Sequence, residues 1–250
     1  MTIVLLRRTW RLGLLACLMM ASGWAGASGL QVTPTTLSLK ASQNADGLTL
    51  GNTGDDVVHA QVRVYHWTQN ETGDQLAPSS GLVISPPMLQ IASGNQQLIR
   101  VIRVGPPPSG MGAVEDAYRL AVDELPVDTK KGPGLHFVLH YSVPIFVEPA
   151  GAAAPSPQLQ WKLQQEGQRV MLEVSNHGNG HAQLATLNFV DSAGHRTEIE
   201  AGLLGYVLPG STMHWVLKPP VKTFTTGGTL EVMINGQETT QNLSLASRSP

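Results

Sequence analysis

The feature that most constrains the fold is an alternation of apolar and polar residues with a period of two. Leu48 and Leu50 alternate ahead of a turn at residues 52–54, and the stretch from Tyr118 to Asp123 alternates in the same way. No long stretch has the i, i+3, i+4, i+7 spacing of an amphipathic helix, and 26 glycines and 17 prolines are too many for a helical protein. Short alternating segments separated by turn residues are typical of antiparallel β-sandwiches, so the sequence predicts an all-β protein.

The composition of the chain changes near residue 150. Residues 148–157 read Glu-Pro-Ala-Gly-Ala-Ala-Ala-Pro-Ser-Pro, a run that has no periodicity and is rich in small residues and proline. Such a run is typical of an interdomain connection. We therefore expect an N-terminal domain at residues 28–149, a linker at 150–157 and a C-terminal domain at 158–250. Because each domain has the size of one immunoglobulin-like sandwich, the expected architecture is two tandem immunoglobulin-like β-sandwiches.

A short internal repeat supports this division. The motif Asn-x-Gly at 52–54 precedes His-Ala-Gln at 59–61, and the same two motifs recur at 176–178 and 181–183. An alternating segment follows each copy. We expect both copies to form the turn between two early strands of a sandwich.

The first 27 residues have the composition of an export signal. Arg7, Arg8 and Arg11 precede an apolar run from Leu12 to Met20, and Ala25-Gly26-Ala27 fits a signal-peptidase cleavage site. We therefore expect residues 1–27 to be a signal peptide. The only cysteine, Cys17, lies in this segment, so the mature protein is expected to have no disulfide bond.

Two other interpretations of the N-terminus compete with plain secretion. Leu14-Leu15-Ala16-Cys17 loosely resembles a lipoprotein box, which would place a lipid on the cysteine, but the apolar stretch before it is too short for an h-region. Arg7-Arg8 suggests twin-arginine export, but no cofactor motif follows. We favour plain secretion.

Charge and motifs exclude several function classes. The formal net charge is −2 at pH 7 and becomes more negative without the arginines of the signal, which argues against nucleic acid as a partner. No later run approaches the roughly 20 apolar residues of a membrane helix, so no stable membrane insertion is expected. The chain has no G-x-S-x-G elbow and no phosphate-binding glycine loop before a helix. No catalytic residue and no cofactor is predicted, and the protein is not expected to be an enzyme.

The histidines do not form a recognisable metal motif. His177 and His181 are four residues apart, but they lie in a glycine-rich loop, whereas this spacing puts two ligands on one face only in a helix. His136 and His140 share one face of an expected strand, as is typical of a solvated polar face. No metal site is predicted.

The most informative segment runs from Gly134 to Pro149, because every odd position in it is apolar. These positions are Leu135, Phe137, Leu139, Tyr141, Val143, Ile145 and Val147. At about 3.3 Å per residue the segment spans roughly 50 Å, which is long for a strand. We expect the last three residues to fill the sandwich core. The first three either belong to the same core or stand near an open edge and are offered to another protein, because soluble proteins normally suppress exposed apolar edges.

Several motifs together resemble the periplasmic chaperones of chaperone–usher pilus assembly, the PapD-like family. They are Val32-Thr33-Pro34-Thr35, Ser85-Pro86-Pro87-Met88, Gly94-x-Gln96-x-x-x-Arg100-Val101, Tyr118-Arg119-Leu120 running to Glu124-Leu125-Pro126, and Tyr141-Ser142-x-Pro144-x-Phe146-Val147-x-Pro149. In the second half, residues 206–211 with Trp215 resemble the branch that serves spore-coat-U-like pilins. The resemblance covers essentially the whole mature chain.

The resemblance implies donor-strand complementation in the periplasm. A pilin subunit is an incomplete sandwich that lacks its last strand, and the chaperone lends its own G strand. Leu135, Phe137 and Leu139 would enter the groove of the subunit, with Tyr141 as a fourth candidate. The implied partners are pilin or fimbrial subunits and an outer-membrane usher, without a cofactor. A dimer in which the free chaperone caps its own edge is an alternative that the sequence leaves open.

The sequence departs from the family in the cleft between the domains. Many members hold the C-terminal carboxylate of the subunit with an arginine and a lysine, whereas this chain has Thr36 and Pro144 at those places. Many also pair an acid of the F strand with a base of the G strand. Glu124 fits the acid, but Glu148 stands where the base would be.

Other bases are candidates to hold the client in that cleft. They are Arg100, Arg119 and the pair Lys130-Lys131. The two arginines are also expected to have structural roles, and the lysines lie in a glycine-rich loop where solvation is the simpler interpretation.

Two rival functions stay open. One is a structural or adhesive fimbrial component, although residues 28–31 form too short a mature N-terminus to act as a donor extension. The other is an exported two-domain module that binds a peptide or a sugar. Such a module should cluster aromatics in its loops, and only Tyr65 and Trp67 approach that pattern.

Overall fold

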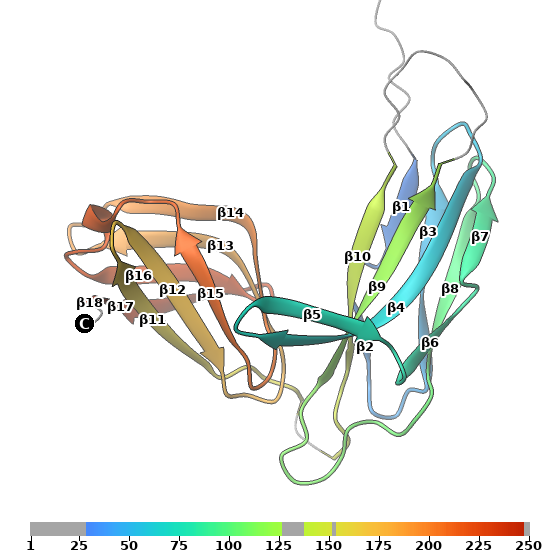
Figure 1. The fold of residues 1–250 in the computed structure, drawn as a ribbon, viewed down its shortest axis with the longest axis horizontal. Coiled ribbons are helices and arrows are strands. Elements are labelled where there is room, and N and C mark those ends of the chain that lie inside the picture. The colour runs from blue at the N-terminus through green and yellow to red at the C-terminus, as the bar shows by residue number, and fades with distance from the viewer. Residues whose placement is uncertain (1–28, 127–137, 152–153, 248–250) are drawn as a thin grey trace, which may run out of the picture.

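The computed structural model describes residues 29–126, 138–151 and 154–247 and is built almost wholly of β-strands (Figure 1). The predicted signal peptide, residues 1–27, lies outside the described residues. No helix in the described part of the chain is long and apolar enough to cross a membrane. The elements are β1 (Leu30–Thr33), β2 (Leu37–Leu39), β3 (Ala45–Asn52), β4 (Val58–Asn70), β5 (Gly73–Pro78), β6 (Leu82–Ser85), β7 (Met88–Ile91), β8 (Gln96–Arg103), β9 (Asp116–Leu125), β10 (His140–Val147), β11 (Leu159–Glu166), β12 (Arg169–Asn176), β13 (Ala182–Asp191), β14 (Arg196–Val207), β15 (Thr212–Leu217), the 3₁₀ turn η1 (Val221–Thr223), β16 (Gly228–Ile234), β17 (Gln237–Leu243) and β18 (Leu245–Ser247).

The N-terminal half folds into two packed sheets. One sheet has the strand order β1-β3-β8-β6, and the other has the order β2-β10-β9-β4-β5 with β7 paired to β4. Apolar side chains from both sheets fill one core, in which Leu50, Ile99 and Leu120 are fully buried. The alternation of the sequence produces this core because successive residues of a strand point to opposite faces.

The C-terminal half forms a second sandwich with its own core. Its sheets have the orders β15-β12-β11-β18 and β14-β13-β16-β17. Phe189 and Phe224 are fully buried there, with ring centres 4.8 Å apart. The predicted all-β fold of two tandem sandwiches is therefore confirmed. The two sandwiches are set at a wide angle, and the long β4–β5 ribbon reaches from the first towards the second (Figure 1).

The repeated Asn-x-Gly motif forms the same buried turn in both sandwiches, at the end of β3 and at the end of β12. In each copy the asparagine Oδ1 accepts the N–H of the glycine two residues on, and Nδ2 donates to the carbonyl four residues on. Nδ2 also donates to a carbonyl of another segment, that of Ile91 for Asn52 and that of Val207 for Asn176. The internal repeat of the sequence is therefore also a repeat of the structure.

Strand β10 has the predicted core face, and its opposite face is buried in part as well. Val143, Ile145 and Val147 are buried in the N-terminal core, as expected. On the opposite face, Phe146 is also fully buried, because it packs against residues of the C-terminal sandwich. The alternation of the sequence does not predict this second buried face.

Candidate functional site: an open strand edge beside the domain junction

Strand β10 leaves part of one edge unpaired among the residues that the structure describes. Strand β9 covers one side of β10 along its whole length, from His140 to Val147. On the other side, β2 pairs in parallel with β10 only from Ile145 to Val147. The stretch His140–Pro144 therefore has no described strand on that side, and we call it the open edge.

Two hydrogen bonds show which backbone groups face the open edge. The carbonyl of Leu139 accepts an N–H from β9, so the odd-numbered residues pair with β9. The N–H of Glu148 donates to a carbonyl of β2, so the even-numbered residues face the β2 side. The N–H and C=O groups of His140 and Ser142 thus point to the open edge, because backbone groups alternate along a strand. Pro144 has no N–H to offer there, and an edge is where a sheet tolerates proline.

The structure describes two of the four predicted subunit-binding residues. Leu139 and Tyr141 are half-buried and pack against the N-terminal core. The hydroxyl of Tyr141 donates to the carbonyl of Leu30 at 2.6 Å, which holds this side chain against its own domain. Leu135 and Phe137 lie outside the described residues.

Three of the five predicted cleft residues lie at the junction of the two sandwiches. Arg119 and Pro144 stand opposite each other on β9 and β10. Thr36 makes a side-chain hydrogen bond to Tyr206 of the C-terminal sandwich, whose ring is also close to Arg119. Burial raises the pKa of the Tyr206 hydroxyl, an effect that Arg119 and two hydrogen bonds oppose.

The structure does not bring the other two cleft candidates to the junction. Arg100 is exposed on β8, in the other sheet of the N-terminal sandwich. Glu124 lies at the end of β9 that is remote from the junction, where its Oε2 accepts the N–H of Leu139 at 3.0 Å. The alternative bases Lys130 and Lys131 lie outside the described residues.

The guanidinium of Arg119 packs over aromatic rings. Its guanidinium carbon lies 3.6 Å from the centre of the Trp67 ring and 5.0 Å from that of Tyr206. Its ion pair with Asp74 is long, at 3.8 Å between Nη2 and Oδ2, and the Arg119 side chain is only 14% exposed. Burial lowers the pKa of Arg119, and Asp74 partly opposes the shift. The group stays charged, because the ordinary pKa of arginine lies far above neutrality.

An aromatic cluster joins the two sandwiches around Arg119. Trp67, Phe146 and Tyr206 are buried together with Ala117 and Leu208. The rings of Trp67 and Tyr206 meet edge to face, with centres 5.3 Å apart. Trp67 is 1% exposed, so it is not available to the ligand of a free-standing binding module. The sequence pattern does not predict this cluster, and its one signal in the segment is a large aromatic residue, Phe146, at an even position.

Polar contacts cross the junction beside this cluster. The carboxylate Oε2 of Glu115 lies 2.6 Å from Nδ1 of His181 and accepts the backbone N–H of His181 at 2.8 Å. The imidazole of His181 stacks on Phe146, with ring centres 3.5 Å apart and planes inclined by 3°. The amide of Gln69 donates to the carbonyl of Tyr206 and accepts the N–H of Leu208.

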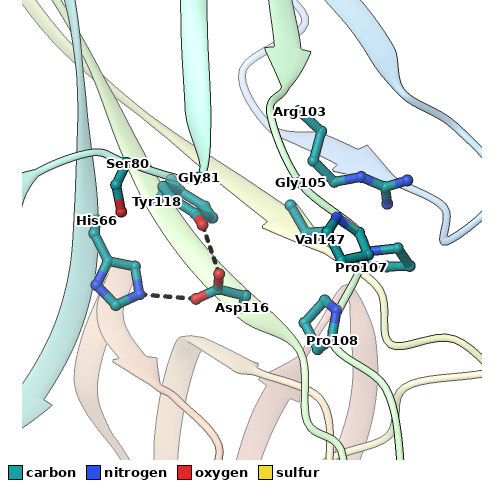
Figure 2. Close-up of a pocket in the computed structure, with 11 residues that line it drawn as sticks. His66, Ser80, Gly81, Arg103, Gly105, Pro107, Pro108, Asp116, Tyr118 and Val147 are labelled. Carbon is teal, nitrogen blue, oxygen red and sulfur yellow. Dashed lines mark hydrogen bonds and ion pairs between the residues drawn. The ribbon is translucent and has the colours of Figure 1, made fainter.

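A cavity of about 430 Å³ opens at the base of the N-terminal sandwich (Figure 2). His66 and Tyr118 converge on Asp116, at 2.8 Å from Nε2 to Oδ1 and at 2.6 Å from the hydroxyl to Oδ2. Burial and this hydrogen bond raise the pKa of Tyr118. Gly81 leaves room for the tyrosine, because a Cβ there would lie 2.2 Å from its hydroxyl oxygen. Within the described residues no group of three or more His, Cys, Asp or Glu side chains could hold a metal ion.

Comparisons with known proteins agree with this architecture. The chain is 26% identical over 166 residues to the "Probable fimbrial chaperone protein ElfD" of Escherichia coli K12, a match over 65% of this chain and 66% of that protein. The chain thus spans about two thirds of the length of this relative. Its fold is similar to a chain of the CsuC–CsuE chaperone–tip adhesion subunit pre-assembly complex from archaic chaperone–usher Csu pili of Acinetobacter baumannii. There the TM-score is 0.67, the identity 24%, and the coverage 87% of this chain and 99% of that one.

A second solved structure is the complex of SafA pilin with the SafB chaperone of Salmonella enterica. The TM-score is 0.58 at 16% identity, with 87% of this chain and 95% of that chain covered. The family model of pili and flagellar-assembly chaperones, PapD N-terminal domain, matches residues 29–153, which is half of the sequence. This protein therefore belongs to the family of pili and flagellar-assembly chaperones.

Proposed function

We propose that the protein is a periplasmic chaperone that holds fimbrial subunits by donor-strand complementation and delivers them to an outer-membrane usher. The observation that carries the proposal is the open edge of β10. A subunit that lacks one strand needs backbone donors and acceptors, and His140 and Ser142 present theirs to that side. Two of the fold neighbours come from complexes of a chaperone with a tip subunit or a pilin.

The side chains that enter the groove of the subunit are Leu135, Phe137 and Leu139. In the sequence they stand at the odd-numbered apolar positions before Val143, Ile145 and Val147, which fill the N-terminal core, and Leu139 packs against the border of that core. Burial of each side chain in an apolar groove stabilises the complex by roughly 1.5–3 kcal/mol. Tyr141 is bonded to Leu30, so it lies at the border between the domain core and the client.

Arg119 is our candidate for the anchor of the client's C-terminal carboxylate. The guanidinium is charged, lies over the Trp67 ring and has one long ion pair, so its N–H donors have capacity for an anion. The ring of Tyr206 is close to Arg119, and its hydroxyl, which accepts from Gln183 and Thr36, keeps its own O–H as a neutral donor. This anchor takes the place of the arginine–lysine pair that the sequence lacks.

The decisive test is the substitution Phe137→Asp in the tagged protein, purified from its own periplasm and analysed by mass spectrometry. We expect the wild type to co-purify with a small all-β subunit in stoichiometric amount, and the variant to lose it. The reason is that a carboxylate entering an apolar groove pays a large desolvation cost.

The matched control is Val138→Asp. Val138 is the next residue, it is 55% exposed, and it stands at an even position of the alternating sequence. This variant should keep the subunit. Undiminished capture by a folded Phe137→Asp protein would contradict the assignment of the groove-binding face.

A further inference from the structure

The start of β10 is held by two consecutive acidic residues of the neighbouring strand β9. Oε2 of Glu124 accepts the backbone N–H of Leu139 at 3.0 Å, and the backbone N–H of Glu124 donates to the carbonyl of Leu139 at 2.9 Å. The carboxylate of Asp123 bonds to Nδ1 of His140. Leu139 is therefore held through both of its backbone groups, and His140 through its side chain.

The bond to the Glu124 side chain departs from the pattern of an ordinary antiparallel ladder. In a hydrogen-bonded pair of such a ladder, each residue donates its N–H to the backbone carbonyl of the other. Leu139 accepts from the backbone of Glu124 as this pattern requires, but its own N–H bonds to the carboxylate. A hydrogen bond to an ionised acceptor is roughly twice as strong as a neutral one. The contact with β9 is therefore reinforced at the residue that directly precedes β10.

This end of β10 has fewer strand partners than the other end. From Ile145 to Val147 the strand pairs with β9 on one side and with β2 on the other. From His140 to Pro144 the described residues include a partner strand on the β9 side only. Segments with few backbone partners open locally at a low cost in free energy. Glu124 thus strengthens the end of β10 that would otherwise open first.

The geometry leaves Glu124 in place when another strand adds to the open edge. Leu139 directs its backbone groups towards β9, whereas His140 and Ser142 direct theirs to the open edge. A strand that pairs with the open edge therefore does not compete with Glu124 for Leu139.

The side chain of Leu139 lies at the border of the N-terminal core. It is half-buried against that core, whereas Val143, which packs in the same core, is 3% exposed. Part of the Leu139 side chain is therefore still available to a partner. Because ordering a residue during binding costs conformational entropy, a Leu139 that is already held extended binds at a smaller cost.

We propose that Glu124 is a positioning residue whose carboxylate holds Leu139 in the extended conformation before a client arrives, so that the open edge begins at a defined residue. This role rests on the proposed function, because it concerns how the client is received. Glu124 does not need to touch the client. Asp123 adds a second link at the next residue of β10, and its own carboxylate is bonded to Arg63 of β4 at 2.6 Å.

Nuclear magnetic resonance of the Leu139 amide tests the contact itself. The shift of an amide proton bonded to a carboxylate follows the ionisation of that carboxylate, so the wild type should show a titration step between about pH 3 and 6. The step should be absent in Glu124→Gln. In Glu124→Ala, hydrogen exchange of this amide should be at least about tenfold faster. Asp123 and His140 titrate nearby, so Asp123→Asn is the control, and it should keep the step.

The affinity for a purified subunit tests the role in binding. Glu124→Ala should bind roughly tenfold more weakly, which corresponds to the backbone entropy of about one residue. Glu124→Gln should recover most of the affinity, because its amide oxygen is still an acceptor. Glu124→Thr, whose side chain is too short to replace the carboxylate but suits a strand, repeats the test in a second variant. The matched control is Glu198→Ala, since Glu198 is exposed on β14 of the C-terminal sandwich.

Each outcome decides a different point. A wild-type Leu139 amide without the titration step, or a step that persists in Glu124→Gln, would overturn the contact. A changed amide with wild-type affinity in folded Glu124→Ala or Glu124→Thr would overturn the role in client binding. If the wild type binds no subunit, the proposed function fails, while the amide still decides whether Glu124 holds Leu139.

Discussion

At the scale of single residues, Arg119 illustrates how a charged side chain is kept available at a junction between domains. Its long side chain lies on the Trp67 ring, so the charged end is fixed without a close carboxylate that would occupy its donors. The partner Asp74 is 45% exposed and lies at the long distance of 3.8 Å, which makes this ion pair weak. A carboxylate that enters the junction would compete with Asp74 for the guanidinium of Arg119, and the weak pair with Asp74 would be easy to replace.

We therefore predict that Arg119→Ala weakens client binding at least about tenfold, because charge-assisted hydrogen bonds are lost. Thr36→Ala should have a mild effect, on the order of fivefold or less, since only a neutral hydroxyl is removed. Arg100→Ala is the control, because Arg100 is exposed on the other sheet. Binding of a purified subunit, measured by calorimetry, gives the three affinities.

A client with a few residues added to its C-terminus tests the carboxylate anchor independently of the side chains that pack in the groove. The extension should weaken binding to the wild type and have no further effect on Arg119→Ala. A complete loss of binding in Thr36→Ala would contradict the assignment of Arg119 as the main anchor.

Single residues also show what the sequence alone could and could not predict. The repeated turn at Asn52 and Asn176 could be predicted from the sequence, because a turn of this kind depends on residues close together in the chain. The aromatic partners of Arg119 could not be predicted from the sequence. Trp67 and Tyr206 are far apart in sequence, and only the packing of the two sandwiches brings them together.

At the scale of elements, β10 uses its sides for different purposes. One edge pairs with β9, one face fills the N-terminal core, and Phe146 on the other face packs at the junction. The alternation of the sequence predicted the core face, because burial in one domain follows the period of the strand. It could not predict the second face, since that depends on where a neighbouring domain docks.

The direction of the backbone groups of β10 gives a test at this scale. Ser142→Pro removes an N–H from the open edge and leaves the hydrogen bonds to β9 in place, so the protein should fold but bind clients poorly. Val143→Pro removes an N–H that pairs with β9, so it should destabilise the domain itself. Circular dichroism with urea unfolding, next to a capture assay, distinguishes the two variants. Normal capture by Ser142→Pro would show that the client does not pair with this edge.

At the scale of the whole molecule, each sandwich carries a surface carboxylate whose pKa is lowered by a basic partner. A hydrogen bond from Arg63, supported by His140, lowers the pKa of Asp123 below its ordinary value of 3.8. Lys162, with a smaller contribution from His214, lowers the pKa of Glu173 below 4.5. Both sandwiches therefore depend on ionised carboxylates for part of their stability.

The sign of the pH dependence follows from these shifts. A lowered pKa in the folded state contributes stability that is present above the unfolded-state pKa and is lost as the pH falls through the folded one. We expect the urea midpoint to be nearly constant from about pH 7 to 5 and to decrease below about pH 4. Asp123→Asn and Glu173→Gln should each make the decrease of the urea midpoint below about pH 4 smaller. A decrease that already begins near pH 6 would contradict this account, because carboxylates whose pKa is lowered stay ionised at that pH.

Assignment to a family of chaperones also confirms that the protein is not an enzyme, as the lack of catalytic motifs predicted. The fold class could be predicted from the sequence, because each sandwich repeats local patterns of alternation and turns. The angle between the sandwiches could not be predicted from the sequence, because contacts across the junction, such as that of Glu115 with His181, join residues far apart in the chain.

The short pairing of β2 with β10 has a consequence for how clients are aligned. Leu37–Leu39 occupy the edge from Ile145 onwards, and Pro144 offers no donor just before that point. A strand added to this edge must therefore end its pairing at a fixed residue of the chaperone, whatever its own sequence. Subunits with different sequences would therefore all pair with the same stretch of the chaperone backbone, which ends before Ile145.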